Sequence, residues 1–172
     1  MDGVGFSHHN HTECIRLGLH SAEVYCKSTG LQFTPVRRRV LELLLAEHHA
    51  RGAYEILDRL RDEGFGSQPP VVYRALEFLV RHGFAHKIEQ LNAFIACAHL
   101  VENHSPVFLI CRACDSVVET HTDVTKGALG KAAKSAEFII ERTVVEVEGC
   151  LLYTSDAADE RSSVDLGGRR II

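Results

Sequence analysis

Apolar residues recur every three to four positions through the first half of the chain, the spacing of helices that bury one face. Four such segments, separated by stretches that contain glycine or proline, cover about residues 12–28, 34–48, 53–63 and 71–82. Thr34-Pro35 provides an N-cap and a first-turn proline, and Gly83 is a natural helix stop. In the third segment we expect an inward face made of Tyr54, Ile56, Leu57 and Leu60.

The pattern changes to alternation after Gly83. Residues 84–90 and 93–97 predict two short strands joined by a turn. Helices followed by a hairpin describe a winged helix-turn-helix, in which the fourth helix reads DNA and the hairpin is the wing. On that helix the inward face is expected to consist of Val72, Leu76 and Leu79, which leaves Tyr73 and Arg74 pointing outwards.

A second unit follows the hairpin. Its pattern predicts strands at 107–111, 116–119 and 138–148 and a helix at 125–136. We therefore expect an α+β protein with a winged helix-turn-helix domain over residues 1–89, which includes an N-terminal helix, and a small α/β domain over residues 90–150. The acidic character of this second domain is compatible with a sensing or dimerisation domain. Residues 151–172 show no clear period, and we expect a non-native tail there.

Composition narrows the class of protein. A hydrophobic content of 45% in 172 residues supports a packed core, and no apolar run reaches the roughly 18 residues that a membrane span needs. The absence of a secretory signal favours the cytoplasm. The net charge of −4 is a mild objection to DNA binding, which the clustering of arginines between residues 37 and 81 softens.

Side chains that bind transition metals crowd the region after the fourth helix. They are His86, Cys97, His99, His104, Cys111, Cys114 and Glu119. Thiolates beside imidazoles suit zinc better than magnesium or calcium, and Cys111-x-x-Cys114 has the spacing of a zinc knuckle. Catalytic zinc needs an open position and a nearby base. No H-E-x-x-H or H-x-E…P-C-x-x-C pattern occurs, so we expect no enzyme.

Several motifs together resemble the ferric uptake regulator family, and most closely its zinc uptake regulator branch. They are Thr34-Pro35-x-Arg37, Tyr54-x-Ile56-Leu57, Pro69-Pro70-x-Val72-Tyr73-Arg74-Ala75-Leu76, Gly83-Phe84, His86-Lys87, Asn92-Ala93-Phe94 and Cys111-x-x-Cys114. The resemblance covers about residues 12–150. It implies a homodimeric repressor of zinc uptake genes, in which zinc orders the dimer so that two winged helices reach a palindromic, AT-rich operator.

The resemblance also implies two zinc sites. The sensory site falls on His86, Cys97, His104 and Glu119, with His99 as a possible substitute ligand. The structural site takes two C-x-x-C pairs, of which Cys111 and Cys114 supply the first. Cys150 stands one place too early for the second pair, and no further cysteine follows it in the sequence. Asp115 replaces a usual glycine. The structural site is therefore expected to hold two or at most three cysteines.

The fourth helix supplies the expected contacts to DNA. Arg74 can pair with guanine and the Tyr73 ring can contact a thymine methyl, while Arg37 suits phosphates. Two alternatives stay open. One is a sensor of iron, manganese or peroxide in the same family, against which the thiolate of Cys97 argues. The other is a zinc-stabilised interaction module without a DNA role, against which the Tyr73-Arg74 pair argues.

Overall fold

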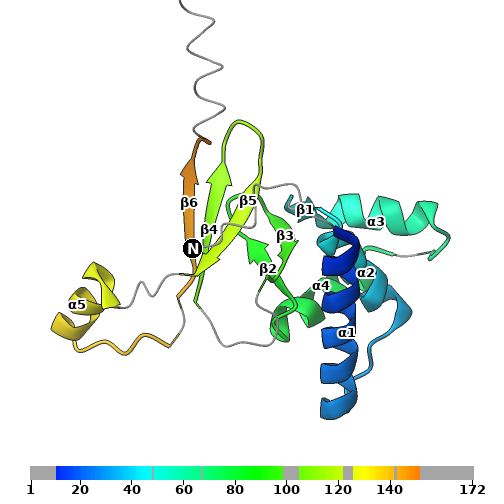
Figure 1. Cartoon of the computed structure of the whole chain (residues 1–172), viewed down its shortest axis with the longest axis horizontal. Coiled ribbons are helices and arrows are strands. Elements are labelled where there is room, and N and C mark those ends of the chain that lie inside the picture. Colours follow the sequence, from blue (N-terminus) through cyan, green and yellow to red (C-terminus); the bar gives the residue numbers. More distant parts are fainter. Residues whose placement is uncertain are drawn as a thin grey trace, which may run out of the picture.

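The computed structural model describes residues 11–47, 49–66, 68–98, 105–121, 126–141 and 143–151. Four helices come first: α1 (His11–Thr29), α2 (Pro35–Leu45), α3 (Ala53–Asp62) and α4 (Pro69–Arg81). The strands are β1 (Arg51–Gly52), β2 (Ala85–Ile88), β3 (Ala93–Ala96), β4 (Pro106–Cys111), β5 (Val117–His121) and β6 (Val145–Gly149), with α5 (Ala128–Ser135) before the last (Figure 1). The predicted α+β class and the winged helix-turn-helix are confirmed.

The four helices share one apolar core. It contains Leu41 and Leu44 of α2, Ile56 and Leu60 of α3, and further leucines of α1 and α4, all nearly inaccessible to solvent. The Thr34 hydroxyl caps α2 by accepting a hydrogen bond from the Arg37 N–H at 3.4 Å. No helix in the described part of the chain is both long and apolar enough to cross a membrane.

The wing is a three-stranded antiparallel sheet of order β1-β3-β2. β2 and β3 form the expected hairpin, with His86 opposite Ile95. The short strand β1 was not predicted, because two residues are too few to show a period. It is held in place by Arg51, a buried residue that pairs with Glu47 at 2.7 Å and with Glu55. Through β1, the wing is joined directly to the start of α3.

The second sheet has the order β5-β4-β6, with β4 and β5 antiparallel and β4 and β6 parallel. One face of β4 carries Phe108 and Ile110, which are buried against the wing residues Ile88 and Ile95 in a second apolar cluster. In Figure 1 the wing hairpin lies between this sheet and the four helices. The apolar contact between the two sheets brings the wing residues next to β5.

Three details of the structure predicted from the sequence pattern were wrong. The strand expected at 138–148 begins only at Val145, because Phe138 and Ile139 are 67% and 83% exposed. The helix expected at 125–136 begins at Ala128. Tyr54 is 66% exposed rather than inward, because the buried face of α3 starts at Ala53 and repeats at 56, 57 and 60. Neither the sheet order nor the helix-turn-helix is affected.

Candidate metal centre

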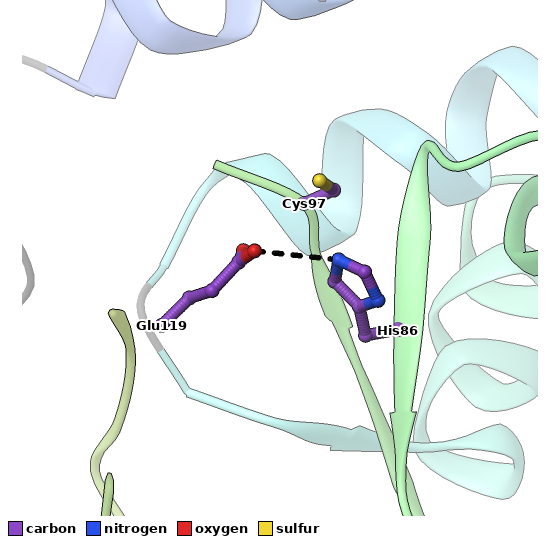
Figure 2. A group of neighbouring side chains, drawn as sticks. All are labelled: His86, Cys97 and Glu119. Atoms are coloured by element: carbon purple, nitrogen blue, oxygen red, sulfur yellow. Dashed lines mark ion pairs between the residues drawn. The ribbon is translucent and has the colours of Figure 1, made fainter. Parts of the chain in front are cut away.

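Three of the predicted sensory ligands meet where the two sheets touch. His86 lies in β2, Cys97 follows β3 directly, and Glu119 lies in β5. Cys97 is held beside β2 because its N–H donates to the Phe84 carbonyl at 3.0 Å. One ligand atom from each of His86, Cys97 and Glu119 lies within 4.8 Å of the other two (Figure 2). The structure thus brings together residues that are 11 to 33 positions apart in the chain.

The group is shielded from water. The side chains of His86 and Glu119 are 12% and 3% exposed, and Cys97 is 2% exposed. The His86 ring packs against Phe108, with 5.3 Å between the ring centroids. Because charged groups lose much of their hydration when they are buried, the Glu119 carboxylate needs a positive or hydrogen-bonding partner.

Glu119 has two neighbours that orient it. Its Oε1 lies 3.5 Å from His86 Nε2, and its Oε2 accepts a hydrogen bond from the Ala98 N–H at 2.8 Å. The dashed line in Figure 2 marks the first of these. The carboxylate therefore points from the second sheet towards the wing, with one oxygen anchored and the other facing the imidazole.

The donor set of nitrogen, sulfur and oxygen fits zinc. Zinc bonds of about 2.0–2.3 Å place ligand atoms roughly 3.3–3.8 Å apart, so small side-chain shifts would close this group around one ion. A closed tetrahedral site needs a fourth ligand. The predicted fourth ligand His104 and the substitute His99 lie outside the described residues.

The second predicted site has a less complete geometry. Cys111 ends β4 and is buried, whereas Cys114 lies in the following turn, is exposed and has its sulfur 3.2 Å from the Ser116 hydroxyl oxygen. Asp115, in place of a glycine, adopts φ 53°. The backbone N–H of Leu151 donates to the Cys111 sulfur, and the Ala113 N–H does so with a smaller effect. Together they lower the pKa of this thiol to about 7. A lowered pKa favours the thiolate that a metal requires.

The third cysteine does not complete this site. β4 and β6 are parallel, and Cys111 pairs with Gly149. Gly149 is the last residue of β6, and Cys150 follows it directly. Cys150 is exposed. Within the described ranges the group at His86 is the only one that gathers three metal-type ligands, so two thiols remain for the structural site.

The residues expected to contact DNA divide into two kinds. Tyr73 is 46% exposed and Arg74 is exposed, while their neighbours Val72 and Leu76 are buried, as the pattern of α4 predicted. Arg37 instead stacks on Phe78, with its Cζ 3.7 Å from the ring centroid, and donates to the Gln32 carbonyl. Part of the Arg37 side chain therefore stabilises the junction of α2 and α4.

The sequence analysis missed two residues that support the metal group, the name used from here on for His86, Cys97 and Glu119. The Ala98 backbone N–H binds Glu119, and no side-chain pattern could reveal a backbone donor. Phe108, against the His86 ring, is fully buried and lies in the centre of an apolar strand. Its large size in β4 was the available signal, but nothing in the pattern paired that strand with β2.

Known proteins are similar to this chain in sequence and in fold. Residues 28–148 match the model of the Ferric uptake regulator family. The zinc uptake regulation protein of Escherichia coli (strain K12) is 35% identical over 133 residues, covering 76% of this chain and 77% of that protein. A solved zinc uptake regulator complexed with zinc and DNA has a TM-score of 0.77 at 30% identity and covers 84% of this chain and 97% of that chain. The crystal structure of holo XcZur has a TM-score of 0.71 at 36% identity, over 86% and 99% of the two chains.

Proposed function

Because the chain belongs to the ferric uptake regulator family, we propose that it is a cytoplasmic, zinc-responsive repressor that binds operator DNA of zinc uptake genes as a homodimer. The observation that carries this proposal is the buried group of His86, Cys97 and Glu119, whose ligand atoms lie within 4.8 Å of one another. Relatives named for zinc uptake regulation support the same assignment.

The ligand types favour zinc over the other metals sensed in this family. A thiolate and an imidazole suit zinc, whereas manganese prefers carboxylate and water oxygens. With His104 as the fourth ligand, the site would be closed by protein groups. A closed site leaves no position for a reacting water, which agrees with a regulatory rather than a catalytic role.

The position of the ligands suggests how zinc would act. His86 and Cys97 belong to the wing, and Glu119 belongs to the second sheet. An ion bound by all three would fix the angle between the DNA-binding part, which includes the wing, and the dimerisation part that carries the second sheet. Zinc would then select the arrangement in which both winged helices of the dimer fit a palindromic operator.

Other residues take secondary roles in this proposal. Tyr73 and Arg74 would contact bases in the major groove, and Arg37 would contact phosphates. Cys111 and Cys114 would bind structural zinc with only two protein thiolates. Because structural zinc normally has four protein ligands, this second site would bind the ion more weakly than the sensory site.

DNA binding under buffered zinc tests the proposal. Fluorescence anisotropy of a palindromic, AT-rich operator should rise with free zinc for the wild type, and scrambled DNA should respond far less. Cys97→Ala should abolish the response, because it removes a ligand from the buried group. Cys14→Ala, which changes a half-buried thiol of α1, is the matched control.

The same titration separates the alternatives. Iron or manganese supporting operator binding at lower free concentration than zinc would contradict the zinc assignment. Zinc binding without any operator response, in wild type and control alike, would point to an interaction module that does not bind DNA.

A further inference from the structure

Three residues form a row across the second sheet on the face that meets the wing. Phe108 of β4 pairs with Glu119 of β5 on one side and with Glu146 of β6 on the other. Paired residues in a sheet point to the same face. Phe108 is buried against the wing, so both carboxylates are directed towards the wing as well.

The two carboxylates bind opposite ends of the wing hairpin. Glu119 accepts from the Ala98 N–H just beyond β3, as described above. Glu146 Oε1 accepts from the Glu89 N–H at 2.7 Å, and its Oε2 accepts from the Gln90 N–H at 3.0 Å. Glu89 and Gln90 form the turn between β2 and β3. A single carboxylate thus holds two consecutive backbone amides of that turn.

This contact is suited to fixing the hairpin. The N–H groups at positions 89 and 90 lie beyond the last β2–β3 pair, Ile88 with Ala93, and so have no strand partner in the ladder. Hydrogen bonds from amides to an ionised carboxylate are stronger than those to neutral acceptors. Glu148 adds only one long contact, at 3.4 Å, to the Gln90 side chain.

We infer that Glu146 is a positioning residue for the metal group, which latches the wing turn to the second sheet without any metal. The latch keeps β2 and β3 against β4, and this brings His86 and Cys97 close to Glu119 before an ion binds. Its effect on zinc rests on the proposed function, whereas the latch itself does not.

Preorganisation of this kind changes the zinc concentration at which the site fills, and it does not change the structure of the zinc-bound protein. Without the Glu146 contact, part of the zinc-binding free energy is consumed in bringing the wing to the sheet. Zinc should therefore bind more weakly, by about tenfold, a typical size for coupling between two sites. Once zinc is saturating, the arrangement and the affinity for DNA should equal those of the wild type.

Amide hydrogen exchange on the full, metal-free chain tests the latch. Glu146→Gln keeps the size of the side chain but replaces one acceptor oxygen with an NH2 group, which cannot accept. Exchange at the Glu89 and Gln90 amides should become at least about tenfold faster. Glu148→Gln, the same change two residues away on the same face, should leave both rates unaltered. Equal rates in wild type and Glu146→Gln would overturn the latch.

Zinc affinity, measured by competition with a chromophoric chelator, tests the positioning role. Glu146→Gln should need about tenfold more free zinc than Glu148→Gln, with operator affinity at saturating zinc unchanged. Equal zinc affinities would overturn the role. If Glu146→Gln does not fold, Glu146→Asp, which retains the charge but shortens the reach, serves instead. A wild type with protected amides but no zinc binding would refute the proposed function and the positioning role, and would leave the latch supported.

Discussion

Single side chains decide how the metal group is held. His86 and Glu119 come from two strands and Cys97 directly follows a third, and each is oriented by a neighbour that is not a metal ligand. Phe108 packs on the imidazole, and the Ala98 amide anchors the carboxylate. Such outer contacts commonly change metal affinity by about 10–100-fold when removed, so the neighbours matter nearly as much as the ligands.

His82 provides a residue-scale prediction about pH. Its ring packs on Phe78, with 4.6 Å between centroids, and burial, followed by the charges of Arg81 and Arg37, lowers the pKa of His82 below 6.5. The unfolded chain therefore binds the proton more readily. Stability should be unaffected by this residue above about pH 6.5 and should fall as the pH drops from there towards the lowered folded pKa.

Urea unfolding at about pH 7.5 and about pH 5.5 measures this effect. His82→Gln should lose less stability between the two conditions than the wild type. His20→Gln, which changes an exposed histidine of α1, should lose as much as the wild type. A pH dependence that is the same for both variants would refute the role of His82.

At the scale of elements, α4 has one buried face and one exposed face. Val72, Leu76 and Leu79 are at most 1% exposed and join the helical core, while Tyr73 and Arg74 project from the first turns. Pro69 and Pro70 fit this start because the first helical N–H groups need no partner within the helix. A helix built this way can lose its outer side chains without losing its place in the fold.

Arg74→Ala should therefore weaken operator binding and leave folding intact. Loss of a bidentate contact to a base costs about 1–3 kcal/mol, or roughly five- to 150-fold in affinity, whereas thermal unfolding should be unchanged. Arg61→Ala removes the same charge from α3 and is the control. Equal losses of affinity in the two variants would indicate a general charge effect instead of recognition by α4.

Periodicity predicted the elements that are long and bury one face. The four helices were placed from sequence because each repeats its burial pattern over several turns, and the hairpin and β4 were placed because their short apolar runs are bounded by turn residues. β1 failed because two residues carry no period, and Tyr54 failed because an aromatic ring at a helix start fits either face. The contact of Phe108 with His86 depends on which sheet packs on the wing, and the local spacing of residues cannot predict that packing.

For the candidate site, the ligands themselves were predictable only through motifs. The residue types alone identified a set of candidate cysteine and histidine ligands, and the family resemblance selected among them. The structure brings His86, Cys97 and Glu119 together, and among the described residues it gathers no third ligand beside Cys111 and Cys114. The first outcome could not be predicted from spacing, because these ligands belong to two different sheets.

At the scale of the whole molecule, two apolar side chains on the face of the second sheet opposite the wing are exposed among the described residues. Leu109 and Val147 are neighbours in the β4–β6 register and are 40% and 44% exposed. An exposed apolar pair on a sheet is suited to contact with a second subunit. This face is independent of the wing, which packs on the opposite side of β4.

Val147→Glu should shift the protein from dimer towards monomer, because the new charge would lose its hydration in the subunit contact. Sedimentation over a range of protein concentrations measures the change, and operator affinity should fall with it. Val24→Glu, at a 53% exposed position of α1, is the control and should remain dimeric. A dimer unaffected by Val147→Glu would place the interface elsewhere.

The wing turn has a further consequence for how the two parts of the chain move. Two of its backbone N–H groups are occupied by Glu146, and the Glu89 carboxylate beside them pairs with Lys87 at 2.5 Å. A turn tied to the second sheet in this way should tilt together with that sheet. The hairpin would then work as a joint that transmits motion between the four helices and the second sheet.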